Sequence, residues 1–168
     1  MNRQLAPLLA MRSTPPLTDT QRAAHSVEAA YWLRFIADGR RTEVFRIDSA
    51  EEALSVSISN PDVARDVLAA LGTLAKPSVQ QRLVEVGLSQ GFPDDIRNLA
   101  TFHAGYHIQR FGRMIDNEQA MAVEQAWRNE ADPATKTALG VVVGALGVNP
   151  AKATEEIRNF PASTTPLP

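Results

Sequence analysis

The stretch from Asn60 to Gln90 constrains the fold of this chain more than any other part. It reads NPDVARDVLAALGTLAKPSVQQRLVEVGLSQ. Asn60 followed by Pro61 signals a helix start, because the Asn side chain can accept a bond from a free backbone N–H and proline gives up an N–H that had no partner. Apolar residues then recur at helical spacing on both sides of a break at Lys76-Pro77. The stripes are Val63, Val67, Leu71 and Leu74, then Val79, Leu83 and Val86. We therefore expect a helical hairpin.

The first helix of this unit recurs along the chain. Residues 61–74 align without a gap with residues 133–146, and residues 93–97 match residues 61–65. A second helix follows each copy and is expected at 77–90, at about 117–130 and at 150–160. Helical hairpins that recur with a period of roughly 30 to 40 residues are typical of a stacked repeat, in which no hairpin buries its apolar face alone.

The N-terminal part of the chain is less regular. Residues 1–16 contain prolines and no sustained apolar period, so we expect a flexible arm. Thr18 to Gln21 has the spacing of a capping box and predicts a helix to about Ala37. The expected inner stripe of that helix is Ala29, Trp32, Leu33 and Ile36.

Two further segments complete the predicted domain, which spans residues 17–160. Residues 40–48 are expected to form a connector with Phe45 and Ile47 packed inward. A second capping box, Ser49 to Glu52, predicts a short helix to about Ile58. Residues 161–168 are expected to be a disordered tail.

The repeated units resemble HEAT repeats of the short bacterial type, over roughly residues 60–160 and with residues 17–58 as a degenerate first unit. The matching features are Asp62-Val63-Ala64-Arg65, Leu71-Gly72-Thr73-Leu74, Asp95-Ile96-Arg97, and Leu139-Gly140 with Gly144-Ala145-Leu146. The chain departs from the pattern at Lys136 and Thr137, where an Arg is expected, and at His103, which takes the place of Leu71 and Val143. The resemblance implies an all-α, right-handed superhelix (an α-solenoid) of about three hairpins, with the second helices lining a concave groove.

Composition limits the classes of function. The formal net charge of −2 and the pI near 5.9 argue against a general nucleic-acid or anionic-membrane binder. The chain contains no cysteine, which excludes disulfides, thiolate zinc sites and cysteine nucleophiles. The N-terminal apolar run is too short for a secretory signal or a membrane span. We expect a cytoplasmic protein, or a domain of a longer one.

Few residues point to chemistry. His103 and His107 share a helix face and could present two imidazoles to a metal ion, but no third ligand accompanies them, so we expect structural histidines at the junction of adjacent hairpins. Neither a cofactor nor a catalytic residue is predicted. The basic group Arg34, Arg40, Arg41 and Arg46 is interpreted as a solvated connector that pairs with nearby acids. Tyr31, Trp32, Phe35 and Trp127 are expected in the core, and Gly140, Gly144 and Gly147 at close helix contacts.

The sequence therefore favours a non-enzymatic scaffold that binds a protein or peptide in the groove of the repeats. The candidate surface residues are Gln81, Arg82, Glu85, Gln125, Arg128, Lys152 and Glu155. The alternative is a small-molecule or chromophore-handling protein of the HEAT-like phycobilin-lyase type, with a pocket near His103 and His107. A third reading, DNA binding as in HEAT-like glycosylases, is disfavoured by the charge. Apolar surface at either end of the array would predict a weak homo-oligomer or a neighbouring domain.

Overall fold

The computed structural model describes residues 17–39 and 47–147. Within these ranges the regular structure is entirely helical, with seven α-helices and no strand, so the all-α prediction is confirmed. The helices are α2 (Asp19–Asp38), α3 (Glu51–Ser57), α4 (Ala64–Leu71), α5 (Pro77–Leu88), α6 (Asp94–Phe111), α7 (Asn117–Asn129) and α8 (Pro133–Gly147), and a 3-10 turn, η2 (Asp48–Ala50), precedes α3. Four predictions lie outside the described residues: the arm at 1–16, the inward packing of Phe45, the helix at 150–160 and the tail at 161–168.

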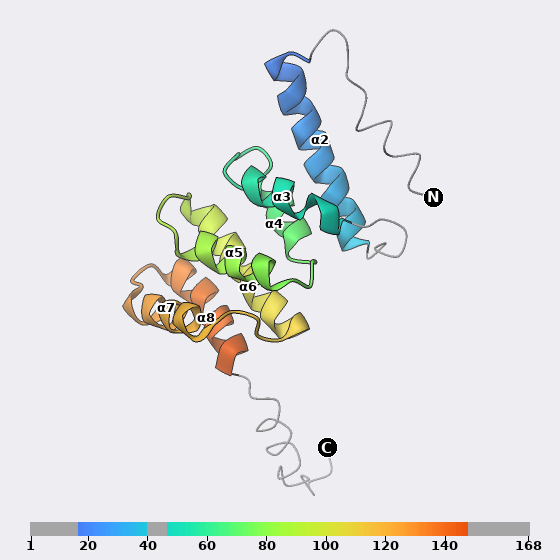
Figure 1. Ribbon diagram of the computed structural model, residues 1–168. Coiled ribbons are helices and arrows are strands. Elements are labelled where there is room, and N and C mark those ends of the chain that lie inside the picture. Colours follow the sequence, from blue (N-terminus) through green and yellow to red (C-terminus); the bar gives the residue numbers. More distant parts are fainter. Residues whose placement is uncertain (1–16, 40–46, 148–168) are drawn as a thin grey trace, which may run out of the picture.

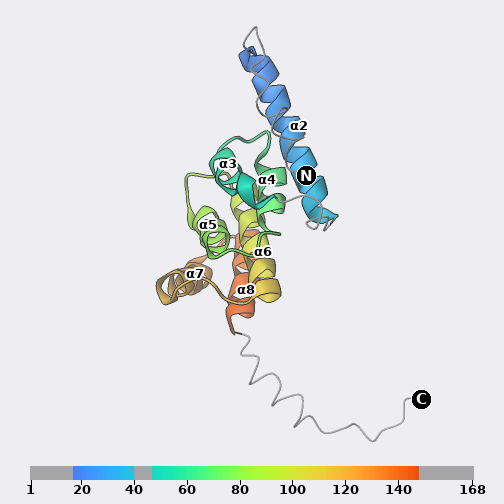
Figure 2. The same ribbon diagram turned by 45° about the vertical axis from the view of Figure 1, so that its right-hand side comes forward.

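The helices contact one another in two rows. In one row α2 contacts α4, α4 contacts α6 and α6 contacts α8; in the other, α3 contacts α5 and α5 contacts α7. The rows are joined by the pairs α3 with α4, α5 with α6, and α7 with α8. Figures 1 and 2 show α2 at one end of the described helices and α7 with α8 at the other.

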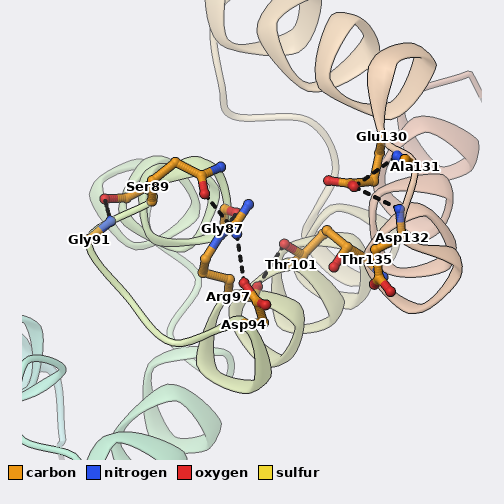
Figure 3. A network of polar contacts seen from close by, with 11 residues as sticks. Gly87, Ser89, Gly91, Asp94, Arg97, Thr101, Glu130, Ala131, Asp132 and Thr135 are labelled. Carbon is orange, nitrogen blue, oxygen red and sulfur yellow. Dashed lines mark hydrogen bonds and ion pairs between the residues drawn. The ribbon is translucent and has the colours of Figure 1, made fainter.

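The hairpin expected at residues 60–90 is not the main packing unit. Helix α5 packs on α6, which follows it, and only marginally on α4, which precedes it. The reason lies at Gly87, where a Cβ would stand 2.3 Å from the Thr101 hydroxyl, so α5 approaches α6 through a position with no side chain. Arg97 of α6, which is 8% exposed, completes the contact by donating to the Gly87 carbonyl (3.4 Å) and to Asp94 (2.9 Å), as Figure 3 shows.

The apolar stripes predicted for residues 63–86 are confirmed. All seven of their members are buried: Val63, Val67, Leu71, Leu74, Val79, Leu83 and Val86. Helix α4 nevertheless begins at Ala64 and not at Pro61, because the Asn60 side chain accepts from the Asp62 N–H (3.1 Å) and forms a turn before the helix.

The two predicted capping boxes have different outcomes. The first is confirmed, since Thr18 accepts from the Gln21 N–H (3.2 Å) and its own N–H donates to Gln21 Oε1 (2.9 Å). The second is wrong: α3 follows η2 without a side-chain cap. Its first residue, Glu51, instead accepts from Lys76 (2.6 Å) and Ser78 (2.5 Å), and so ties α3 to the start of α5.

The inner face of α2 also differs from the prediction. The buried residues are Ala30 and Ala37, whereas Ala29 is exposed and Trp32 is 51% exposed. Leu33 and Ile36 are partly buried. The buried face of α2 is therefore rotated by about one residue from the predicted face. Small alanines let the C-terminal half of α2 approach α4 closely, and Arg34 adds an ion pair to Asp66 of α4 (2.7 Å).

The expected aromatic core is wrong for three of its four members. Tyr31, Trp32 and Phe35 are each about half exposed. Trp127 is partly buried and packs against the core. The aromatic side of α2 therefore points away from the described helices that pack on it.

The glycines of α8 were predicted at close helix contacts, but they do not lie at the tightest ones. A Cβ at Gly140 would make an ordinary 3.4 Å contact with Trp127, and one at Gly144 or Gly147 would meet nothing within 4 Å. The close approach of α6 to α8 occurs at Gly105, where a Cβ would stand 2.6 Å from Val141 Cγ1 and 3.3 Å from the Val141 carbonyl carbon.

These two kinds of glycine predict opposite effects of the same substitution. We expect Gly144→Ala to raise the free energy of unfolding by about 0.5 to 1 kcal/mol, because alanine restricts the unfolded chain and forms helix better than glycine. Gly105→Ala should lower it by about 1 kcal/mol or more, because the stiff Val141 side chain cannot move away freely. Urea denaturation measures both values, and a stabilised Gly105→Ala variant would contradict the α6–α8 packing.

Candidate functional site

A cleft of about 540 Å³ lies between α5 and α7. Its lining residues are Gln81, Val84, Glu85, Leu88 and Ser89 of the α5 side, with Asp116, Glu118, Gln119 and Ala122 of the α7 side. The structure thus brings two of the predicted surface residues, Gln81 and Glu85, into one concave site. A third, Arg82, lies next to the site and contacts Glu85 (3.4 Å).

The other predicted surface residues do not join this cleft. Gln125 and Arg128 are exposed on α7 away from the cleft lining, and Arg128 pairs with Glu124 on its own helix. Lys152 and Glu155 lie outside the described residues. The sequence predicted a groove lined by three successive second helices. Of these, the structure describes α5 and α7, and the cleft lies between them.

The cleft has an acidic rim and an apolar floor. Glu85, Asp116 and Glu118 are exposed carboxylates, and no Lys or Arg is among the residues that line this cleft. Its apolar lining comes from Val84, Leu88 and Ala122. Such a surface attracts a cation and offers an apolar side chain a place to pack.

Gln119 lines the cleft and carries a side-chain oxygen that has no hydrogen-bond partner among the described residues. The backbone N–H of Gln119 donates to Asp116, which caps α7 (2.8 Å). The side-chain Oε1 of Gln119 is buried and accepts no hydrogen bond from the described residues. An unpaired buried acceptor costs about 1 to 3 kcal/mol of stability, so Gln119 is a position where a substitution can stabilise the protein.

The position of α7 relative to α5 depends on a buried polar network around Gln80, which is 0% exposed. Gln80 Oε1 accepts from the backbone N–H groups of Met114 (2.6 Å) and Ile115 (3.0 Å), in the connection between α6 and α7. Its Nε2 donates to the Gly112 carbonyl (3.0 Å) and contacts His107 Nδ1 at 2.9 Å. The amide of Gln80 is therefore fully used.

This network defines the protonation of His107, which is 1% exposed. Because Gln80 Nε2 is a donor, His107 Nδ1 must accept, and the ring hydrogen lies on Nε2, which donates to the Leu74 carbonyl (2.7 Å). Burial lowers the pKa of His107 below its ordinary value, against the opposite effect of the Leu74 bond. Both ring nitrogens are occupied, so this imidazole has no free position for a ligand.

His103 lies one turn earlier on α6 and packs against α4. Its Nδ1 is 3.0 Å from the place where a Cβ of Gly72 would stand, so the imidazole occupies the space above that glycine. Burial lowers the pKa of His103 as well. Both histidines lie at helix junctions, as the sequence predicted, but only His107 has hydrogen bonds to its ring nitrogens among the described residues.

The described part of the chain offers little support for other chemistry. No three side chains of His, Asp or Glu come together there as a possible metal site. Of the predicted basic group only Arg34 is described; the hydrogen bonds that it donates to Asp66 and Asp38 raise its pKa, and it joins α2 to α4. Arg40, Arg41 and Arg46 lie outside the described ranges. In those ranges no helix has the length and apolar character that a bilayer crossing requires.

Sequence reasoning missed Asp116, Glu118 and Gln119 as cleft residues. Their position at the start of α7 offers a sufficient explanation for the two acids, because acidic side chains cap helices and complement the helix dipole. Gln119 and Ala122 are three residues apart and share the side of α7 that faces α5. That spacing is the sequence signal that would have identified the cleft residues of α7.

A comparison of this chain with protein-family models, with curated proteins and with solved structures found no match. The site is therefore interpreted from its own residues.

The Gln80 network predicts a large difference between two adjacent glutamines. Gln80→Leu should lower the free energy of unfolding by about 3 kcal/mol, because it leaves the buried Ile115 N–H, the part-buried Met114 N–H and the part-buried Gly112 carbonyl without partners. Gln81→Leu, the same change one residue later on the cleft side, should alter it by less than about 0.5 kcal/mol. Urea denaturation of both variants would contradict the network if the two losses were equal.

The lowered pKa values of His103 and His107 predict a pH dependence of stability. Near pH 6.5 and below, the unfolded chain binds protons that the folded protein excludes, so stability is greatest above this pH and falls as the pH decreases. Chemical denaturation between about pH 7.5 and pH 5 isolates this effect, because Glu51, whose pKa is lowered by Lys76, titrates below that window.

Two variants test the assignment of that pH dependence. His103→Gln should flatten the profile, because one proton-excluding group is removed. His25→Gln changes an exposed residue of α2 and should retain the wild-type slope. A stability that does not change between pH 7.5 and pH 5, or a slope lost only in His25→Gln, would contradict the burial of the two histidines.

Proposed function

We propose that this protein is a non-enzymatic interaction module that binds a basic, partly apolar segment of another protein in the α5–α7 cleft. The observation that carries the proposal is a cleft with an apolar lining (Val84, Leu88 and Ala122) between the exposed carboxylates Glu85, Asp116 and Glu118. A peptide supplies cations for the carboxylates and apolar side chains for the apolar lining. Each feature of the cleft then has a matching feature in the ligand.

The order of helix contacts supports a second part of the proposal, a right-handed α-solenoid of HEAT-like units. Contacts between successive members of each row, and between the rows, are what a stacked repeat requires. Ion pairs about thirty residues apart in sequence join neighbouring members of one row, Arg34 with Asp66 (2.7 Å) and Arg65 with Asp95 (2.5 Å). In such an array α5 and α7 are neighbours in one row, and the cleft lies between them.

The small-molecule alternative has weaker support. It requires His103 or His107 to converge on a pocket, whereas neither residue lines the α5–α7 cleft or the two smaller clefts beside α8 and α2. His107 uses both ring nitrogens within the protein. Nucleic-acid binding is also disfavoured, because three carboxylates at the cleft would repel a phosphate backbone.

The test uses a defined peptide probe, a fluorescein-labelled octapeptide of alternating lysine and leucine, with a glutamate and leucine peptide as its negative control. We expect the lysine peptide alone to bind in fluorescence anisotropy. Glu85→Gln combined with Glu118→Gln should weaken binding about tenfold. Glu52→Gln combined with Asp62→Asn removes the same charge from exposed positions outside the cleft and should change affinity less than about twofold.

A further variant separates binding from stability. Gln119→Met should leave the melting temperature unchanged or raised, because an unpaired buried acceptor is replaced by an apolar side chain of similar length, and it should change peptide affinity less than about twofold, because the three carboxylates of the rim are kept. If the cleft double variant and its control lost the same peptide affinity, the effect would come from net charge alone. That result would contradict the proposed site. No binding of the lysine peptide at about 1 mM would contradict the proposed function.

A further inference from the structure

Helix α2 carries the largest exposed apolar face among the described residues. Val27 is 40% exposed, Tyr31 and Trp32 are each 51% exposed, and Phe35 is 53% exposed. The rings form a preorganised cluster, with Trp32 in edge contact with Tyr31 (5.7 Å between centroids) and with Phe35 (5.9 Å). A contiguous apolar face of this kind on a helix is unusual for a surface that meets only water.

The face is fully separate from the helix side that packs on the protein. Ala24, Val27, Tyr31 and Phe35 follow one another at spacings of three and four residues, so they form one stripe. The buried Ala30 and Ala37 lie on the opposite side, against α4. The N-terminal half of α2 stands clear of the other described helices in Figures 1 and 2. A partner that covers the stripe therefore does not have to displace α4 from the buried alanines.

Two members of the stripe are placed symmetrically about Tyr31. Val27 lies four residues before Tyr31 and Phe35 four residues after it. In an antiparallel pair of identical helices with a two-fold axis at Tyr31, Val27 of each copy meets Phe35 of the other, so a smaller side chain faces a larger ring twice. Such self-complementarity is what an isologous interface requires.

The available area matches a small dimer. Aromatic side chains bury about 150 to 250 Å² each, so three half-exposed rings offer about 300 Å² per copy and about 600 Å² per pair. The smallest specific interfaces bury about 1,200 Å² in total, of which about 60% is apolar, or about 700 Å². With Val27 and Ala24 added, the two faces reach that apolar share. The area is at the lower limit, so the dimer is expected to be weak.

We infer that this protein forms a two-fold symmetric homodimer through antiparallel packing of the α2 aromatic face (Ala24, Val27, Tyr31, Trp32 and Phe35), with a dissociation constant in the micromolar range. The inference does not rest on the peptide-binding proposal, because the α5–α7 cleft lies towards the other end of the described helices. It extends that proposal, since a dimer presents two clefts in one particle and binds a ligand with repeated basic segments more tightly than a monomer does.

Sedimentation equilibrium of the full-length protein from about 1 μM to about 1 mM tests the inference. The wild type should convert from monomer to dimer in this range. Tyr31→Lys and Tyr31→Glu should each remain monomeric, because each places two like charges at the two-fold axis. An equimolar mixture of the two variants should dimerise again. Tyr106→Lys, the same change at a 59% exposed tyrosine of α6, should dimerise like the wild type.

Two readouts keep the test independent of misfolding. Circular dichroism should show unchanged helix content in every variant. In a Trp127→Phe background, emission from Trp32 should shift to the red on dilution, as the remaining indole of the two in the chain returns to water.

The other outcomes overturn the inference. If the wild type is a monomer at about 1 mM and its Trp32 emission is that of an exposed indole, the aromatic face binds a different protein and not a second copy. If the wild type is a monomer and its Trp32 emission is that of a buried indole, another part of the same chain covers the aromatic face. A dimer that persists in Tyr31→Lys would place the interface elsewhere. Monomeric single variants without recovery in the mixture would contradict the two-fold axis at Tyr31.

Discussion

The side chain of Gln80 is the interaction on which the positions of α5, α6 and α7 depend. It is the only contact described above that joins a helix, a neighbouring helix and the connection to a third. Helix α5 carries Gln80, α6 carries His107, and the connection to α7 supplies the Met114 and Ile115 N–H groups and the Gly112 carbonyl. Direct contact between α5 and α7 is limited, so this network fixes the width of the cleft between them together with the packing of α7 on α8 and of α8 on α6. An apolar core alone would leave that width variable, whereas hydrogen bonds of fixed geometry do not.

The connection after α6 is shaped to serve this network. Gly112 has φ 81°, a left-handed conformation that costs other residues more than glycine. It ends α6, turns the chain and presents its carbonyl to Gln80. His107 extends the network to the Leu74 carbonyl, in the turn between α4 and α5. One glutamine and one neutral histidine thus satisfy backbone groups of two turns that would otherwise be buried without partners.

The helices could be predicted from the sequence because apolar residues at helical spacing and Pro or Thr start signals are local features. Partners in space are not local. Gln80, between Val79 and Gln81, has no sequence feature that indicates burial, since its backbone partners are more than thirty residues away and His107 is 27 residues away. On α2 the larger apolar side chains were expected inside, but a close approach to α4 needs alanines, so Trp32 lies outside. For the candidate site, Gln81 and Glu85 were predictable from their side of α5, whereas Gln119 required the position of α7.

Hydrogen exchange of the Met114 and Ile115 amides tests most directly whether the Gln80 network is permanent in the folded protein. Both amides lie in a connection between helices, where exchange is ordinarily fast. If Gln80 holds them as described, they should exchange only through global unfolding, with the same free energy of opening as the core amides of α5. Exchange at the rate of an exposed loop, while the helical amides remain protected, would contradict the account. The spacing of α5 and α7, and with it the cleft, would then need another cause.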